Sequence, residues 1–294
     1  MANTTQLKRR IGSIKNTRQI TKAMELVAAS KMRRAQSQAL ASRDYQTAAH
    51  EILSRLNNIA EVKRQPLFAE RPVKARLYVI ITSNTGLAGA YNANVIKLLS
   101  SALIEDEAGK ITSQIITISN KAAQYAKRLS GAQLLAAYPG FADHPTVDDI
   151  RPILNSIIDL YKNQSVDQVR LIYTVFKSSL SQQAKVLSLI PAQAETAAEA
   201  QAASAENNII STFEPDIETV IAEVGKRLIE ANLWQALLES IASEHSMRML
   251  AMHSASDNAS DLIEDYTLAY NNARQAAITQ ELAEITGGAE ALNG

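Results

Sequence analysis

The stretch EPDIETVI, residues 214–221, opens the segment of this 294-residue chain that decides the fold. After Pro215 the chain has no further proline, and Gly225 is its only glycine before Gly287. Proline suits the first turn of a helix, and a glycine pair such as Gly287-Gly288 commonly ends one. The segment 212–287 therefore predicts a single C-terminal helix of some 70 residues, about 105 Å long at about 1.5 Å per residue.

The first 60 residues have the same character. They contain no proline and one glycine, Gly12, and Asn3 with Gln6 resembles a capping box. Apolar residues recur at helical spacings of three, four and seven, and we expect them to need burial: Leu7, Ile11, Ile14, Met24, Val27, Ala28, Met32, Ala35 and Ala39. The pattern predicts a helix from about Thr4 to Asn58, a rod of about 80 Å.

Two long helices that each carry one apolar stripe bury those stripes most simply against each other. We therefore expect residues 1–60 and 212–287 to form a long antiparallel coiled coil. Because the N-terminal helix is the shorter and ends near Asn58, part of the C-terminal helix should project alone. We expect that bare stretch to carry Ile278, Leu282 and Ile285.

The middle of the chain, residues 74–191, changes period. Short β-branched runs predict strands at 77–82, 115–118, 133–136, 169–176 and 184–190, and helical stretches near 92–107, 120–130 and 147–162 separate the first four. This alternation predicts an α/β fold: a Rossmann-like βα domain of about five mostly parallel strands, inserted between the two helices. Residues 192–211 are rich in Ala, Gln and Glu without an apolar stripe, and we expect a mobile loop there.

Composition excludes several kinds of protein. The 30 basic and 30 acidic residues cancel, so the total charge favours neither a nucleic acid nor a membrane partner. The absence of cysteine excludes disulfides and thiol chemistry. No apolar run reaches the ~18 residues of a membrane span, and the start MANTTQLKRRIGS lacks the apolar region of a secretory signal. We therefore expect no direct membrane insertion.

The loop SNTGLAGAYN, residues 83–92, follows the first predicted strand, where phosphate-binding loops often lie. Only Gly86 and Gly89 of a three-glycine dinucleotide motif are present, and no G-K-[ST] follows. We favour a tight turn, in which glycine permits a positive φ. The four histidines form no zinc motif, and we interpret His253 and Asp257, one turn apart, as a surface hydrogen bond. The sequence predicts no catalytic, cofactor or metal residues.

The N-terminal helix is strongly basic at its start. Through Arg34 it has nine basic residues against the single acid Glu25, a local net charge of +8. We expect this stretch to dock on an acidic protein surface. A solvated face is the second interpretation. DNA binding is the third, because apolar residues that need burial lie among the basic ones, unlike in the basic region of a DNA-binding zipper.

Two longer stretches, ITKAMELVAASKM at 20–32 and YNNARQAAITQEL at 270–282, resemble the two signature segments of the gamma subunits of F-type ATP synthases, of the bacterial type. Loop 83–92 and residues 240–257 are also similar, so the resemblance covers essentially the whole chain. It implies a central rotor shaft that couples rotation of the membrane c ring to conformational change at catalytic sites of the alpha and beta subunits. It also implies no cofactor and no catalytic role for this chain. The βα domain would be the foot, on the c ring with the epsilon subunit, at the cytoplasmic face of the bacterial cell membrane.

The same resemblance assigns contacts residue by residue. Lys22 and Met24 fall where the family faces an acidic loop of the beta subunit. The resemblance places three further groups: Arg274, Gln275 and Thr279 at a second beta loop; Ile278, Leu282 and Ile285 as an apolar tip in the bearing of the ring; and Phe213, Glu214 and Asp216 at the c ring and epsilon. The competing hypotheses are an oxidoreductase-like βα enzyme with helical appendages and a coiled-coil DNA-binding protein.

Overall fold

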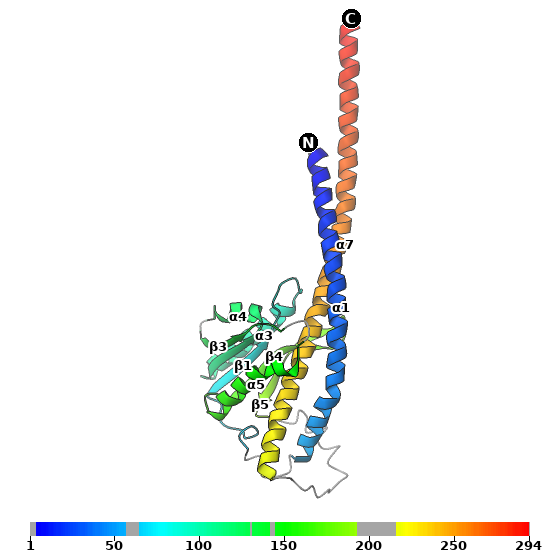
Figure 1. Cartoon of the computed structure of the whole chain (residues 1–294). Coiled ribbons are helices and arrows are strands. Elements are labelled where there is room, and N and C mark those ends of the chain that lie inside the picture. The colour runs from blue at the N-terminus through cyan, green and yellow to red at the C-terminus, as the bar shows by residue number, and fades with distance from the viewer. Residues whose placement is uncertain (1–3, 57–64, 130, 142–144, 193–215, 294) are drawn as a thin grey trace. The chain divides into compact units, whose positions relative to one another are not determined.

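The computed structural model describes residues 4–56, 65–129, 131–141, 145–192 and 216–293. It divides into two compact units, Met1–Ala28 with Arg248–Gly294, and Ala29–Met247. The elements follow one another as α1 (Thr4–Leu56), β1 (Ala75–Ile81), α3 (Tyr91–Ala108), β2 (Thr112–Ile118), α4 (Asn120–Ala126), β3 (Ala132–Tyr138), α5 (Val147–Lys162), β4 (Gln168–Phe176), β5 (Gln182–Ile190) and α7 (Ile217–Asn293) (Figure 1).

The unit Ala29–Met247 is built on a five-stranded sheet with the strand order β3-β2-β1-β4-β5. The first four strands are parallel, and β5 runs antiparallel to β4. A direct connection of five residues, 177–181, joins β4 to β5, and so short a link permits only an antiparallel pair. The predicted α/β class with about five mostly parallel strands is confirmed.

The sheet carries a hydrophobic core on each face. Alternate side chains of β1, such as Leu77 and Val79, pack in one core with α5 and residues of α7 that include Leu228 and Leu233. The intervening side chains, such as Tyr78, pack in the other core with α3 and α4. The period of two along a strand thus divides one buried strand between two helical layers. The helices of one face include part of α7, so the βα layer and the C-terminal helix share a core.

Helix α5 has the predicted bounds, 147–162, because its ends and its faces are marked clearly in the sequence. The carboxylate of Asp149 accepts hydrogen bonds from the backbone nitrogen of Thr146, at 2.7 Å, and from its hydroxyl, at 3.0 Å. Together these contacts hold the first turn. Ile150, Ile153, Leu154, Ile157 and Ile158 then repeat at helical spacing and are buried.

Helix α7 differs from its prediction at the C-terminal end. It continues through Gly287 and Gly288 to Asn293, so the expected end at 287 is wrong. Glycine lowers helix propensity by about 1 kcal/mol relative to alanine, but it ends a helix only where the next turn leaves the helical conformation. Gly225, nearer the start of the helix, has a packing reason, since a Cβ at this position would lie 2.8 Å from the Phe68 ring.

In each unit, α1 and α7 lie side by side and run in opposite directions. In the unit Met1–Ala28 with Arg248–Gly294, Arg10 contacts Tyr266 while Glu25 contacts His253. In the other unit, the hydroxyl of Ser42 donates to the side chain of Gln235. Within the part of the chain that is described, no helix is long and apolar enough to cross a membrane. The predicted antiparallel pairing of the terminal helices is confirmed.

Candidate functional site

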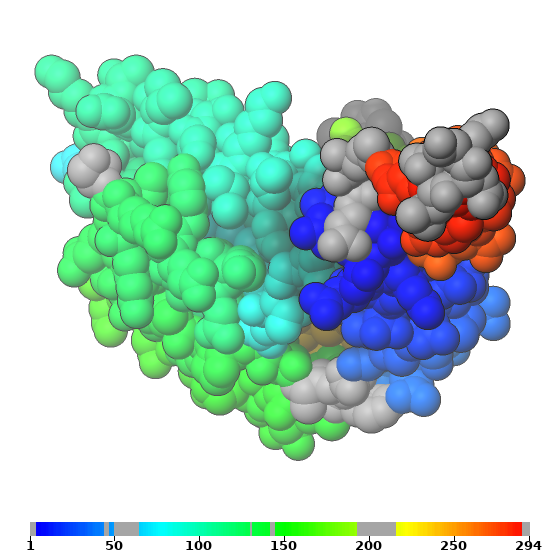
Figure 2. Space-filling model, turned by 90° about the horizontal axis from the view of Figure 1, so that it is seen from above, coloured from blue at the N-terminus to red at the C-terminus, as the bar shows by residue number. Residues whose placement is uncertain are grey.

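The unit Met1–Ala28 with Arg248–Gly294 is a pair of helices, seen side by side in dark blue and orange-red in Figure 2. Their less exposed side chains alternate at spacings of three and four residues, as in a coiled coil. We call these positions the seam. It comprises Leu7, Ile11, Ile14, Thr21, Glu25 and Ala28 of α1, and Met252, Ser256, Ala259, Ile263, Tyr266, Tyr270 and Ala273 of α7.

The seam is apolar toward the N-terminus of α1. Leu7, with 7% of its surface exposed, begins the apolar part. Arg10 lies beside the apolar part of the seam. Its guanidinium is 5.8 Å from the centroid of the Tyr266 ring and donates to the Tyr266 hydroxyl at 3.2 Å. The periodicity predicted that Val27 is buried, but its side chain is 54% exposed, so this prediction is wrong. Val27 lies one position before Ala28, and the small side chain of Ala28 occupies the seam instead.

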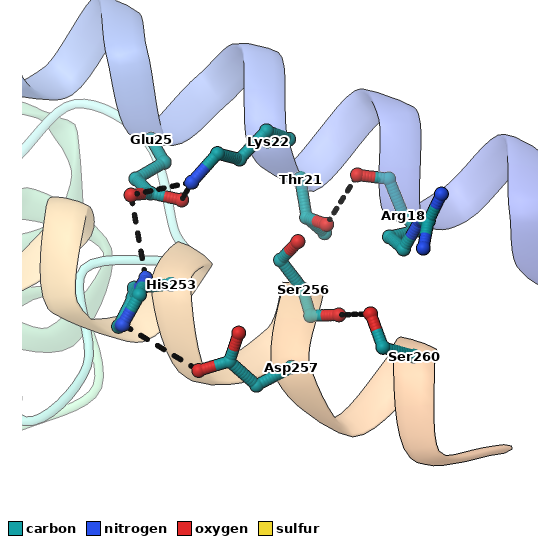
Figure 3. Close-up of polar contacts among 8 residues, drawn as sticks. All are labelled: Arg18, Thr21, Lys22, Glu25, His253, Ser256, Asp257 and Ser260. Carbon is teal, nitrogen blue, oxygen red and sulfur yellow. Dashed lines mark hydrogen bonds and ion pairs between the residues drawn. The ribbon is translucent and has the colours of Figure 1, made fainter.

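Further along, the seam becomes polar (Figure 3). Glu25 lies between Lys22, whose Nζ is 3.0 Å from Oε2, and His253, whose Nδ1 is 3.3 Å from Oε1. The other ring nitrogen of His253 lies 3.4 Å from Oδ2 of Asp257, so these two side chains face each other on the surface of α7. Polar side chains at seam positions reduce the stability of a coiled coil and fix the register of its helices. We call Lys22, Glu25, His253 and Asp257 the polar layer; only Glu25 is a seam position, and the other three side chains are more than half exposed.

The predicted contact residues of α1 lie in or next to this layer. Lys22 is half exposed and forms its ion pair with Glu25 within the same helix. Met24 is partly buried. The contact between Glu25 and His253 was not predicted, because 228 positions separate the two residues and neither belongs to a short motif. The only signal in the sequence was Glu25 itself, the single acid in the basic stretch.

The predicted contact residues near the end of α7 lie on a fully exposed stretch, and every side chain from 274 to 289 is exposed. Arg274, Gln275 and Thr279 belong to it, and the Thr279 hydroxyl donates to the carbonyl of Gln275 at 2.9 Å. Ile278, Leu282 and Ile285 are 47%, 58% and 68% exposed, so this bare stretch carries the three expected apolar residues.

The position of the bare stretch corrects one part of the expectation. It extends past the N-terminal end of α1, and not past the other end near residue 58, because the helices are antiparallel (Figure 1). Its apolar residues also lie off the seam. Continued beyond Ala273, the spacing of the seam leads to Ala277, Gln280 and Glu284. Ala277 and Glu284 each come one residue before Ile278 and Ile285, so the apolar residues lie on a neighbouring face of the helix. The apolar stripe at 278, 282 and 285 is therefore a separate surface.

At the start of α7, Asp216 caps the helix. Its carboxylate accepts from the backbone nitrogen and the hydroxyl of Thr219, both at 2.8 Å. The backbone bond from Thr219, and then the hydroxyl bond, lower the pKa of this carboxyl below its ordinary value. Asp216 thus has a structural role beside any contact with a partner. Phe213 and Glu214 lie outside the described residues, as does the expected loop 192–211 except for Ala192.

The loop at 83–92 is a hydrogen-bonded turn. The side chain of Asn92 accepts from the backbone nitrogen of Ser83 at 3.0 Å and donates to the Ser83 hydroxyl at 2.7 Å. Gly89 has the expected positive φ of 53°, but the second positive φ, 61°, belongs to Leu87 and not to Gly86. Among the described residues, no group of three or more His, Asp or Glu side chains could hold a metal ion.

A buried carboxyl on α7 was not predicted. Glu239 of α7, in the unit Ala29–Met247, is 8% exposed and accepts from Nε2 of Gln235 at 2.9 Å. Nη2 of Arg43 lies 4.0 Å from the same carboxylate. Burial raises the pKa of Glu239, and the Gln235 bond and the Arg43 charge offset this only in part. The folded protein therefore binds this proton more tightly than the unfolded chain does.

A carboxyl whose pKa is higher in the folded protein than in the unfolded chain destabilises the fold as the carboxyl ionises. The free energy of unfolding therefore falls as the pH rises from the unfolded pKa through the folded pKa. We expect Glu239→Gln to raise the melting temperature relative to the unchanged chain at pH 7, and the difference to shrink toward pH 4. The exposed Glu223→Gln is the matched control. Thermal unfolding of the three chains across this pH range measures the effect. A difference for Glu239→Gln that is the same at pH 4 and pH 7 would contradict the assignment.

Comparison with known proteins matches almost the whole chain. The family model described as ATP synthase matches residues 3–292. The ATP synthase gamma chain of Heliobacterium modesticaldum is 40% identical over 288 residues, which are 97% of this chain and 98% of that protein. The ATP synthase gamma chain of Acidithiobacillus ferrooxidans is 39% identical over 292 residues, 99% of this chain and 100% of that protein.

Solved structures with the same fold come from rotary complexes. A chain of the central stalk and c ring of the Tetrahymena thermophila mitochondrial ATP synthase aligns with a TM-score of 0.61 and 26% identity, over 81% of this chain and 99% of that one. A chain from the Euglena gracilis mitochondrial ATP synthase aligns with a TM-score of 0.66 over 98% of this chain and 94% of that one. At 19% identity, the second supports the fold alone.

Proposed function

This chain belongs to the ATP synthase gamma family and is the rotor shaft of that complex, and from this premise we propose that it transmits torque without holding a catalytic site of its own. It couples rotation of the membrane ring to conformational change at catalytic sites that other subunits hold. The two alternatives, an oxidoreductase-like enzyme and a DNA-binding coiled coil, find no support in relatives that match over nearly the full chain.

The observation that carries the proposal is the bare end of α7. A helix in water normally buries its apolar residues, yet Ile278, Leu282 and Ile285 stay exposed on one stripe over about two turns. Such a patch is typical of a surface that another protein covers. Apolar contacts have no preferred direction, so a collar of apolar residues could hold this stripe and still let it turn. We propose that the ring of alpha and beta subunits supplies that collar.

The polar residues of the bare stretch and the basic start of α1 suit contacts that change during a turn. Arg274 is exposed, and a guanidinium can bind carboxylates or carbonyl groups through several donors. The net charge of +8 through Arg34 is complementary to an acidic surface. We assign Arg274, Gln275 and Thr279, and Lys22 with Met24, to two loops of the beta subunits.

We place the other end of the shaft at the membrane. Asp216, with Phe213 and Glu214, is proposed to contact the c ring and the epsilon subunit near the start of α7. The protein then lies on the cytoplasmic face of the bacterial cell membrane, held there by its partners. The cap that Asp216 forms with Thr219 supports this, because a rigid first turn keeps such a contact in a fixed place on the helix.

Arg274→Ala tests the assigned contact. We expect ATP synthesis by the assembled complex to fall about tenfold or more, equivalent to the loss of one charge-assisted hydrogen bond of about 1.5–3 kcal/mol. The isolated chain should keep its fold and melting temperature, because Arg274 is exposed. Gln280→Ala, on another face of the same stretch, is the control. Normal synthesis and normal ATP-driven rotation in the Arg274 variant would show that the assigned contact is wrong.

A further inference from the structure

Three serines of α7 form an unusual contact with the sheet. Ser240, Ser243 and Ser246 lie three residues apart, so they share one side of the helix, and each has 0% of its surface exposed. All three belong to the same compact unit as the sheet. A buried hydroxyl costs stability unless it forms hydrogen bonds, so three in a row need an explanation. We call these residues the serine row.

The serine row binds the backbone of β4 and of the turn that follows it. Ser240 Oγ accepts from the backbone nitrogen of Thr174 at 3.4 Å, and Ser243 Oγ donates to the carbonyl of the same residue at 3.3 Å. Ser246 Oγ donates to the carbonyl of Ser179 at 2.6 Å. Thus both backbone groups of one strand residue are bound by α7.

Two side chains of the βα layer also bind the serine row, one at each of its ends. The hydroxyl of Tyr91, at the start of α3, lies 2.8 Å from Ser240 Oγ. Nε2 of Gln182, the first residue of β5, donates to Ser246 Oγ at 3.0 Å. The serine row therefore connects α7 to three elements of the βα layer: α3, β4 and β5.

This contact differs in kind from the rest of the interface. Between Ile221 and Leu237, α7 packs on the sheet through apolar side chains in the shared core. Apolar packing is non-directional and tolerates a small rotation or shift of a helix. Hydrogen bonds have strict distance and angle requirements, so a small rotation of α7 about its axis would break several of them together.

We propose that the serine row is the torque-bearing contact of the shaft, which prevents the βα layer from turning about α7 when the two are loaded in opposite directions. This inference rests on the proposed function, in which the βα layer is driven at the membrane and α7 delivers the motion elsewhere. Because α7 continues without a break from Ile217 to Asn293, a rotation fixed at the serine row reaches the bare stretch along one helix.

The test uses the assembled complex in sealed vesicles, carrying the chain with Ser240, Ser243 and Ser246 all changed to alanine. The measured quantity is the number of ions pumped per ATP hydrolysed, against an increasing opposing ion gradient. We expect this ratio to match the unchanged complex at zero gradient and to fall at least twofold at high gradient. A stabilising role alone would not make the loss depend on load.

The control is Ser100→Ala with Ser156→Ala. These hydroxyls also form hydrogen bonds, Ser100 with Ile96 and Tyr125, and Ser156 with Pro152 and Tyr138, but none of these partners lies on α7. If the triple variant does not assemble, Ser243→Ala alone and Gln182→Ala probe the contact from its two sides. Each should show the same load-dependent loss, to a smaller extent.

Two results would overturn the inference: a ratio that stays unchanged at every gradient, or an equal loss in the control. Failure of the proposed function would look different, because the complex with the unchanged chain would then pump no ions on ATP hydrolysis. Melting temperatures of the isolated chains show whether the variants compared are equally folded.

Discussion

We expect Asp106→Ala to lower the free energy of unfolding of the isolated chain by about 3–5 kcal/mol, the range for breaking one side of a buried ion pair. Asp106 lies near the end of α3 with 1% of its surface exposed, and it forms an ion pair with the guanidinium of Arg76. The hydroxyls of Tyr78 and Ser113 also donate to its Oδ2, each at 2.8 Å. One carboxylate thus joins α3 to β1 and β2.

The environment of these groups explains the size of the effect. Burial lowers the pKa of Arg76 and raises that of Tyr78, so both groups are poorly hydrated. Alanine at position 106 would leave a buried guanidinium without its counter-charge and the Ser113 hydroxyl without its acceptor. The Tyr78 hydroxyl would keep only the carbonyl of Ala102, 3.3 Å away, as an acceptor.

Urea unfolding of the isolated chain measures this change, and Glu105→Ala is the control because Glu105 is the exposed neighbour. A loss below about 1 kcal/mol, no larger than that of the control, would mean that water or other groups satisfy Arg76 after the substitution.

The second large effect concerns the apolar stripe of the bare stretch. With Ile278, Leu282 and Ile285 all changed to aspartate, we expect ATP synthesis by the complex to be lost. Burying a side chain of this size contributes about 1.5–3 kcal/mol, and a carboxylate in an apolar collar adds a desolvation cost. The isolated chain should remain folded, because the three positions are already exposed.

A matched control places the same three aspartates at Ala277, Gln280 and Ala283, which are exposed on the same stretch of α7 but outside the stripe. Both variants introduce the same three aspartates, and the control loses at least as much helix propensity because alanine is a better helix former than isoleucine. Circular dichroism measures the helicity of both variants. If the control loses synthesis as completely as the stripe variant, then charge or helix stability, and not the apolar stripe, is what matters at this end of the shaft.

Most of the fold could be predicted from the sequence because the residues that interrupt helices, proline and glycine, are concentrated in the middle of the chain. All seven prolines lie between Pro66 and Pro215, and both ends of the chain read as uninterrupted helices. Within the sheet, runs such as 77–81 are apolar without alternation, as expected of a strand that is buried on both faces. The bounds of α5 agree with the stretch predicted near 147–162, and a capping pair and a regular apolar stripe mark them.

Other features could not be predicted because they depend on residues distant in the sequence. Asp106 and Arg76 are 30 positions apart, and neither residue alone indicates an ion pair. In the sequence, the serine row looks like the polar, exposed side of a helix. Its burial follows only from its packing against β4, which the sequence does not show. Gly287 and Gly288 looked like a helix end because sequence rules describe what glycine permits and not what the chain beyond it does.

The contact residues are an intermediate case. The resemblance placed Ile278, Leu282 and Ile285 at a bearing, and the structure adds that the stripe is exposed and separate from the seam. Lys22 and Arg274 were placed in the same way, and what they bind in the complex stays a prediction, which Arg274→Ala tests for one of the two.

Direct observation of rotation tests the central claim that this chain is the turning shaft. The chain has no cysteine, so Glu107→Cys, an exposed position on α3, provides a single site for a fluorescent probe. The complex is fixed to a surface through its alpha and beta subunits and supplied with ATP, while the orientation of the probe is followed. We predict that the probe turns in one direction only, at a rate set by ATP hydrolysis. A probe that holds a fixed orientation while the same complexes hydrolyse ATP at their full rate would contradict this claim.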